Sequence, residues 1–152
     1  MRVIIVAVGM LVAASSAQAQ QTFNKRMTPS NTVRAKALTE RSDFFGPSFF
    51  KEFVTLYGGT VRIRWQVRTS DGSQAVSTGV FVGPNPVHDC DTSTQSTGYV
   101  NEKCDVSVPA GVPIRIWVQV DSTNGPVKGF IRNAQLFFDL IDETKPATVL
   151  QD

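Results

Sequence analysis

Apolar and polar residues alternate along much of this chain, which is the pattern of β-strands that bury one face. Residues 60–68 show it most clearly, because Arg62, Arg64, Gln66 and Arg68 separate valine, isoleucine and tryptophan positions. Residues 76–82, 104–108 and 114–120 repeat the alternation, and residues 130–141 carry apolar side chains on both faces, which favours a central strand. We expect the following side chains to point inward: Val61, Ile63, Trp65, Val67, Val76, Thr78, Val80, Val82, Cys104, Val106, Val108, Ile114, Ile116, Val118 and Val120.

Turn-forming residues separate these stretches. They lie at residues 70–73 (Ser-Asp-Gly-Ser), 83–86 (Gly-Pro-Asn-Pro) and 109–111 (Pro-Ala-Gly). Short strands at regular spacing without a long helical pattern predict an all-β fold, an antiparallel β-sandwich. We prefer a jelly-roll-like arrangement to an immunoglobulin-like one. The immunoglobulin pattern places a core tryptophan between two cysteines, and no tryptophan lies between Cys90 and Cys104.

The first residues have the three parts of a secretory signal peptide. Arg2 precedes an apolar run over residues 3–14, and the segment closes with Ala17-Gln18-Ala19. The run is about a dozen residues long, too short to span a bilayer as a helix. We therefore predict a secreted or periplasmic protein, cleaved after Ala19, whose mature chain has no membrane span.

The remaining chain has the length of one domain. Residues 20–41 are polar and predict an N-terminal arm, with an early strand near residues 33–38 or, alternatively, a short helix. Residues 42–141 contain the alternating stretches and predict the β-sandwich domain. Residues 142–152 are polar and predict a flexible C-terminal tail.

Cys90 and Cys104 are the only cysteines. In an exported protein such a pair most simply forms a disulfide bond. Closing a loop of about 15 residues stabilises a fold by roughly 3 kcal/mol in the chain-entropy model. The two cysteines lack the C-x-x-C spacing of reactive or metal-binding pairs, so a structural role is favoured.

A phenylalanine cluster precedes the first clear strand. It comprises Phe44, Phe45, Phe49, Phe50 and Phe53. So many rings within ten residues predict burial in the core or between the sheets. An exposed patch that contacts a membrane or a partner is the alternative.

The net charge and the available metal ligands limit the functions that this chain can have. The formal net charge is +2 and falls to +1 when Arg2 leaves with the signal peptide, so no global field attracts nucleic acid. His88 is the single histidine, which excludes a transition-metal site made of several histidines. Asp89 and Asp91 offer the oxygen ligands that calcium takes, but their spacing matches no known calcium loop. We expect no metal and no cofactor.

Catalytic motifs are missing as well. The chain has no G-x-S-x-G, no H-E-x-x-H and no phosphate-binding glycine loop. No glutamate sits in a setting that predicts a raised pKa. The mature chain's glutamates are Glu40, Glu52, Glu102 and Glu143. The sequence therefore favours a protein without enzyme activity. The alternative is a glycoside hydrolase, which would need two carboxylates that the fold brings close together.

The outward positions of the strands carry the candidate binding site. One polar row consists of Arg62, Arg64, Gln66 and Arg68, of which Arg64 and Gln66 are the candidate ligand residues, and another consists of Arg115, Trp117 and Gln119. The last strand adds Asn133 and Gln135. If these strands are neighbours in one sheet, a tryptophan platform among arginine and amide groups would suit a sugar, whose acidic groups arginine binds bidentately. The alternative is an ordinary solvated face, with Trp117 packed under other residues.

These observations predict an exported, non-catalytic binding module. Its expected partner is a glycan or cell-envelope polymer, bound through an outward sheet face, and not a nucleic acid. A structural or assembly subunit of an extracytoplasmic protein complex, with a protein partner, is the alternative. A secreted hydrolase is the third reading.

Overall fold

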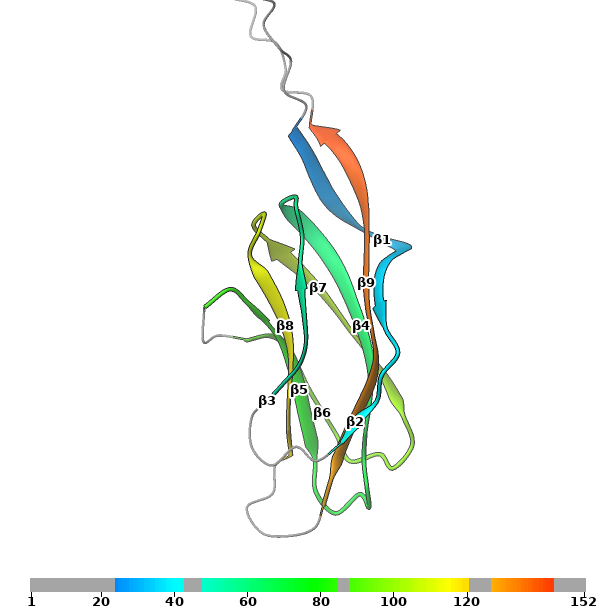
Figure 1. Ribbon diagram of the computed structural model, residues 1–152. Helices are drawn as coiled ribbons and strands as arrows, with labels where there is room; N and C mark the ends of the chain where they lie inside the picture. The colour runs from blue at the N-terminus through cyan, green and yellow to red at the C-terminus, as the bar shows by residue number, and fades with distance from the viewer. Residues whose placement is uncertain (1–23, 43–47, 85–87, 121–126, 144–152) are drawn as a thin grey trace, which may run out of the picture.

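The computed structural model describes residues 24–42, 48–84, 88–120 and 127–143, and within them the chain forms nine strands in two facing sheets (Figure 1). The strands are β1 (Asn24–Ala37), β2 (Arg41–Ser42), β3 (Ser48–Val54), β4 (Gly59–Thr69), β5 (Val76–Val82), β6 (His88–Thr94), β7 (Val100–Val108), β8 (Pro113–Val120) and β9 (Gly129–Glu143). The predicted signal peptide, Phe44, Phe45 and the chain after residue 143 lie outside the described residues.

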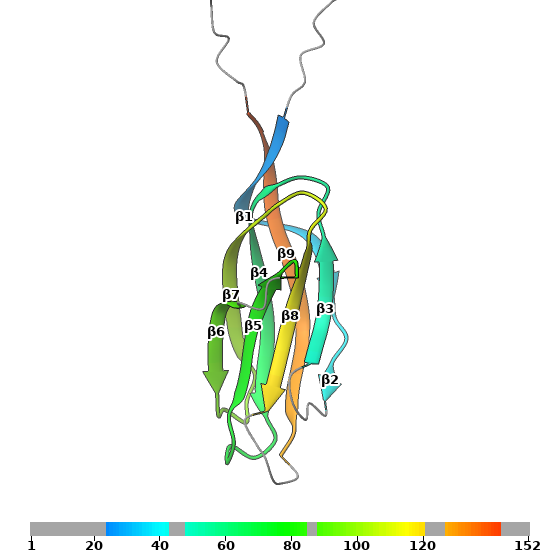
Figure 2. The same ribbon diagram turned by 90° about the vertical axis from the view of Figure 1, so that its left-hand side faces the viewer.

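The strand order is that of a jelly roll. The five-stranded sheet has the order β2-β9-β1-β4-β7, with a further β9–β4 pairing, and the four-stranded sheet has the order β3-β8-β5-β6. Figure 2 shows the four-stranded sheet in front of the other. From β2 to β9, every connection except β5–β6 crosses from one sheet to the other. The predicted antiparallel sandwich of jelly-roll type is therefore confirmed.

The core lies between the sheets, where the inward rows meet. Val61, Ile63, Trp65 and Val67 of β4 are at most 1% exposed. The inward positions of β5, β7 and β8 are buried with them, apart from a half-buried Val82. Trp65 Nε1 donates a hydrogen bond of 3.0 Å to Thr78 Oγ1 of the opposite sheet. This buried indole therefore keeps a polar partner while its ring fills the core.

The segment expected to be an arm is part of the sheet. β1 pairs with β9 from Asn24 opposite Glu143 to Ala37 opposite Ala134, with two register shifts. The early strand is thus formed and extends well before residue 33, and the alternative helix is not adopted. Strand pairing reaches outside residues 42–141 at both ends. Beyond the body of the sandwich, β1 and β9 continue as a two-stranded ribbon (Figures 1 and 2).

Gly59 lets β1 approach the start of β4. Its φ is +133°, in the region that favours glycine, and a Cβ there would lie 2.2 Å from the backbone oxygen of Met27. Met27 and Gly59 are the partners of the parallel β1–β4 pairing, and the Met27 N–H donates to the Gly58 carbonyl at 2.8 Å. A larger residue at position 59 would push the strands apart.

The disulfide joins the two sheets at one side of the sandwich. Cys90 lies on β6 and Cys104 on β7, the edge strands of the four-stranded and five-stranded sheets, with their Cα atoms 5.7 Å apart. The predicted bond is confirmed. The residues between the cysteines include the end of β6 and the start of β7. A disulfide is consistent with a compartment outside the cytoplasm.

Candidate functional site

The predicted site residues lie on two different sheets. Arg64 and Gln66 are on β4 of the five-stranded sheet, whereas Arg115, Trp117 and Gln119 are on β8 of the four-stranded sheet. Their rows face outward on opposite sides of the sandwich, so the single combined face does not exist and that prediction is wrong. Alternation along a strand tells which residues point outward, but both sheets of a sandwich have an outward face.

Trp117 is covered although its strand position points outward. It is 7% exposed, and its ring lies edge-on to Phe81, with the centroids 6.3 Å apart. The Phe81 ring also lies edge-on to the ring of Phe49, with the two centroids 5.5 Å apart. A Cβ at Gly79 would lie 2.5 Å from Trp117 Nε1, so this glycine makes room for the indole. The buried ring does not offer the open face on which a sugar stacks.

The other two residues of that row are engaged in different ways. Arg115 Nε donates to Glu52 Oε2 at 2.7 Å, and its guanidinium carbon lies 5.3 Å from the centre of the Phe49 ring. Gln119 is half-buried and lies opposite Ser77 in the β5–β8 pairing. Nearby, a small hollow of about 230 Å³ is lined by Ser77, Asp91, Thr92, Ser93 and Trp117.

The outer face of the five-stranded sheet holds a larger hollow of about 550 Å³. Eight residues line it: Arg64, Trp65, Gln66, Asn101, Glu102, Lys103, Asn133 and Gln135. It brings together Arg64 and Gln66 with Asn133 and Gln135, all four expected as outward residues. Asn101, Glu102 and Lys103 of β7 were missed. They follow one another on a strand whose inward positions were recognised, but its place beside β4 is a property of the fold.

The register between β4 and β7 arranges this face in cross-strand pairs. Arg62 opposes Asp105, and its guanidinium donates two hydrogen bonds of 2.7 Å to the carboxylate. This contact, chiefly its hydrogen bonds, lowers the pKa of Asp105. Next along the strands, Arg64 opposes Lys103. The outward row is therefore an ion pair followed by two cations.

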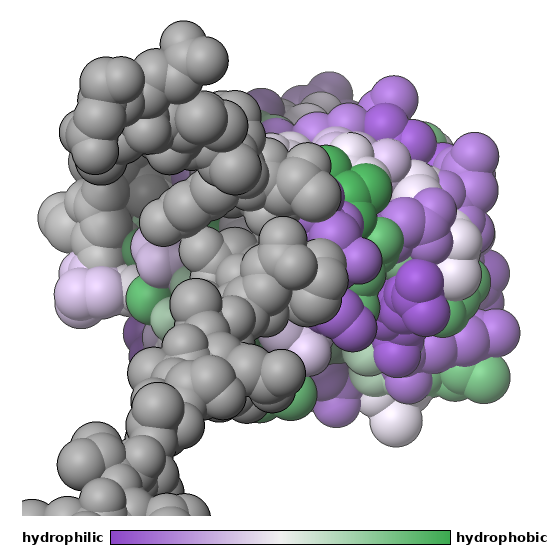
Figure 3. Space-filling view, turned by 90° about the horizontal axis from the view of Figure 1, so that it is seen from above, coloured by the Kyte–Doolittle hydropathy of each residue, from purple (hydrophilic) through white to green (hydrophobic). Residues whose placement is uncertain are grey.

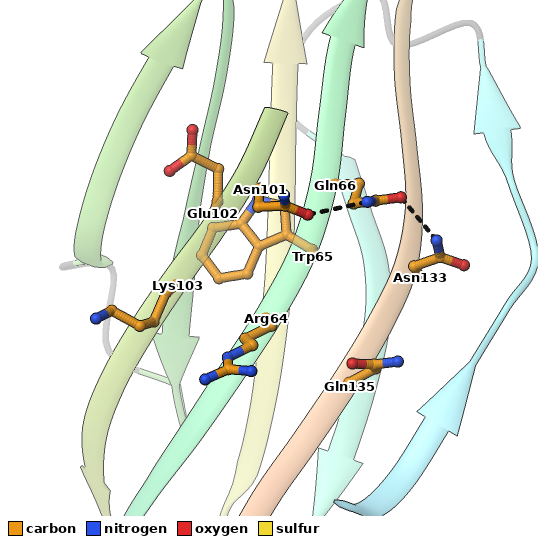
Figure 4. Close-up of a pocket in the computed structure, with 8 residues that line it drawn as sticks. All are labelled: Arg64, Trp65, Gln66, Asn101, Glu102, Lys103, Asn133 and Gln135. Carbon is orange, nitrogen blue, oxygen red and sulfur yellow. Dashed lines mark hydrogen bonds between the residues drawn. The ribbon is translucent and has the colours of Figure 1, made fainter. Parts of the chain in front are cut away.

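A chain of amides follows the cations. Gln66 opposes Asn101 and donates from Nε2 to Asn101 Oδ1 at 2.9 Å. Gln66 Oε1 accepts from Asn133 Nδ2 at 2.7 Å and from Arg132 Nε at 2.9 Å. Figure 4 shows these amides in an upper row, with Lys103, Arg64 and Gln135 below them. Asn133 has a φ of +54° at a register shift of β9, which aims its amide at Gln66.

An aromatic and guanidinium cluster lies beside the amides. The guanidinium carbon of Arg132 is 3.6 Å from the centre of the Tyr99 ring, and that of Arg68 is 5.1 Å from it. The Tyr99 hydroxyl donates a hydrogen bond to Glu40. Burial, and then this hydrogen bond, raise the pKa of Tyr99. Tyr99 lies just before β7, and the cluster joins it to Arg68 of β4 and Arg132 of β9, which is thereby held against Gln66.

Among the described residues that line the hollow, Glu102 is the one with a carboxylate. Burial raises the pKa of its side chain, which a hydrogen bond with Thr92 partly offsets. The sequence had not predicted a raised pKa for this glutamate. Glycoside hydrolysis with two protein carboxylates needs a facing partner, and the lining of this hollow does not supply one.

In the part of the chain that the structure describes, no group of three or more histidine, cysteine, aspartate or glutamate side chains is placed to hold a metal ion, at Asp89 and Asp91 or elsewhere. Those residues also contain no helix of the length and apolarity needed to cross a bilayer.

Comparisons with known proteins give a structural likeness at low sequence identity. No protein-family model matches the chain. No curated protein matches it either. Among solved structures, the chain is similar to a carbohydrate binding module from lichenase 5A of Cellvibrio mixtus in complex with cellotriose. The TM-score is 0.44 and the identity 8%, over 75% of this chain and 100% of the module. The jelly-roll assignment stands on the strand order, independently of this likeness.

Proposed function

We propose that this protein is an exported, non-catalytic binding module that recognises a glycan or cell-envelope polymer through the outer face of its five-stranded sheet. The observation that carries the proposal is the linked amide chain Asn101–Gln66–Asn133 beside the cation Arg64 in one hollow. Amide groups both donate and accept hydrogen bonds, which suits the hydroxyl groups of a sugar.

The arrangement suits such a ligand for two further reasons. The amides are held by one another and by Arg132, so little side-chain freedom is lost when a ligand binds. The hollow, about 550 Å³, is within the size range of small-ligand sites and lies on a sheet face along which a polymer can continue. Trp65 contributes to the lining but is 1% exposed, so recognition rests on hydrogen bonds and charge.

The test uses the chain from residue 20 onward and a panel of glycans and cell-wall polymers. We expect binding by the unaltered protein and about a tenfold loss of affinity in Gln66→Ala, because one to two hydrogen bonds are lost. Gln119→Ala is the matched control, since it makes the same change on the four-stranded sheet. Failure of the folded protein to bind any polymer, or equal losses in both variants, would refute the proposal.

A structural or assembly subunit is the second candidate, favoured by apolar side chains that remain exposed at and after β3. Leu56 is 87% exposed, Val54 59% and Phe49 48%. Figure 3 looks onto the end of the molecule from which the ribbon extends, and shows apolar residues as separate spots among hydrophilic ones. A concentration-dependent oligomer in light scattering would support this candidate, and a strict monomer would contradict self-assembly.

A further inference from the structure

Two like charges face each other in the middle of the proposed binding face. Arg64 and Lys103 are directly opposite partners in the antiparallel β4–β7 pairing. Like charges directly opposite each other destabilise a sheet. The pair on one side, Arg62 and Asp105, is oppositely charged, and the pair on the other side is a neutral amide pair. Repulsion is therefore confined to one position of the register.

The described carboxylates near this position are directed to other partners. Asp105 is held bidentately by Arg62, and Glu102 has a hydrogen bond with Thr92. Figure 4 shows the Glu102 carboxylate pointing away from both cations.

The direct contacts of Arg64 with described residues are to neutral groups, and its charge also acts on the carboxylate of Asp105. It donates to Asn31 Oδ1 at 3.1 Å, and its guanidinium carbon lies 4.8 Å from the centre of the Phe137 ring. Within the described chain, neither Arg64 nor Lys103 forms a salt bridge. Arg62, Arg64 and Lys103 therefore share the single carboxylate of Asp105, so this part of the face keeps a local positive charge.

We propose that Arg64 and Lys103 bind an anionic group of the polymer, so that the ligand is an acidic polysaccharide; this inference rests on the proposed function. A guanidinium binds a carboxylate or sulfate through two parallel N–H groups, and an ammonium adds a point charge. The bound anion would also relieve the repulsion between the two cations. The adjoining amides then contact the hydroxyls of the same or the neighbouring sugar.

The surroundings favour an acidic polysaccharide over a nucleic acid. Nucleic-acid channels follow the phosphate backbone with continuous positive charge and stack bases on exposed aromatic rings. Here Asp105 pairs with Arg62, and Glu40 lies 4.0 Å from Arg132, so carboxylates interrupt the positive charge along this face. The aromatic residue in the lining, Trp65, is buried.

The experiment compares four polymers at one ionic strength: a neutral glucan, a polyuronate, a sulfated galactan and single-stranded DNA. We expect the polyuronate or the sulfated galactan to bind most tightly, and the comparison between them identifies the anionic group. Lys103→Gln should weaken that binding about fivefold to tenfold and leave binding to the neutral glucan unchanged. Lys51→Gln is the matched control, because it removes a lysine charge from the four-stranded sheet.

Stability gives a second, ligand-free readout. If Lys103 and Arg64 repel each other, Lys103→Gln should raise the urea midpoint of unfolding, whereas a lower midpoint would contradict the repulsion. Equal binding to neutral and acidic polysaccharides would overturn this inference and leave the proposed function standing. Absence of binding to any polysaccharide would overturn both the inference and the proposed function. Binding to DNA as tight as binding to the acidic polysaccharides would show unspecific attraction of polyanions, and would overturn the inference.

Discussion

Replacing Trp117 by alanine separates a packing role from a ligand-binding role. The indole is 7% exposed and contacts Phe81, so its removal leaves a void beneath the outer aromatic cluster. Large-to-small replacement of a buried tryptophan costs about 3–5 kcal/mol. We expect the lower end, about 3 kcal/mol, because Trp117 lies on the outward side of its strand, where neighbouring rings can move into part of the space.

Urea unfolding measures this loss. With a slope of about 1.5 kcal/mol per molar urea, a loss of about 3 kcal/mol moves the midpoint down by about 2 M. Phe49→Ala is the control from the same cluster, because Phe49 is 48% exposed and its removal should cost less than half as much. A loss below about 1 kcal/mol in Trp117→Ala, together with lost glycan binding, would refute the packing role and restore Trp117 as a ligand residue.

Two further predictions concern the disulfide and the Arg62–Asp105 contact. Replacing Cys90 and Cys104 by serine should lower the free energy of unfolding by about 3 kcal/mol, because the open loop regains entropy when the chain unfolds; an unchanged urea midpoint would contradict this. Because the pKa of Asp105 is lowered, its contribution to stability is full above the ordinary aspartate pKa and is lost as the pH falls through the lowered value. The difference in urea midpoint between the unaltered protein and Asp105→Asn should therefore shrink between pH 6 and about pH 2, and a constant difference would show that the charge plays no part.

The alternating strands β4, β5, β7 and β8 could be predicted because each buries one face. In β4, the inward residues Val61, Ile63, Trp65 and Val67 alternate with polar ones, and this period of two is a local property of the chain. Likewise, with two cysteines the disulfide had one possible pairing within the chain.

The binding face could be predicted only in part. Arg64 and Trp117 give the same signal in the sequence, since each occupies an outward position of an alternating strand. The strand order places them on opposite sheets, and Phe81 of another strand buries Trp117. Lys103 joins the candidate site because the β4–β7 register sets it opposite Arg64.

The sequence by itself thus determined the alternating strands β4, β5, β7 and β8, which side of each of them is buried, and which cysteines join. Those properties depend on neighbours along the chain and on the energy of removing apolar side chains from water. Only the tertiary structure decided which outward rows share a face. That choice is made by hydrogen bonds between strands distant in sequence, here the pairing of β4 with β7 and β9, and it places the amide row beside the two cations.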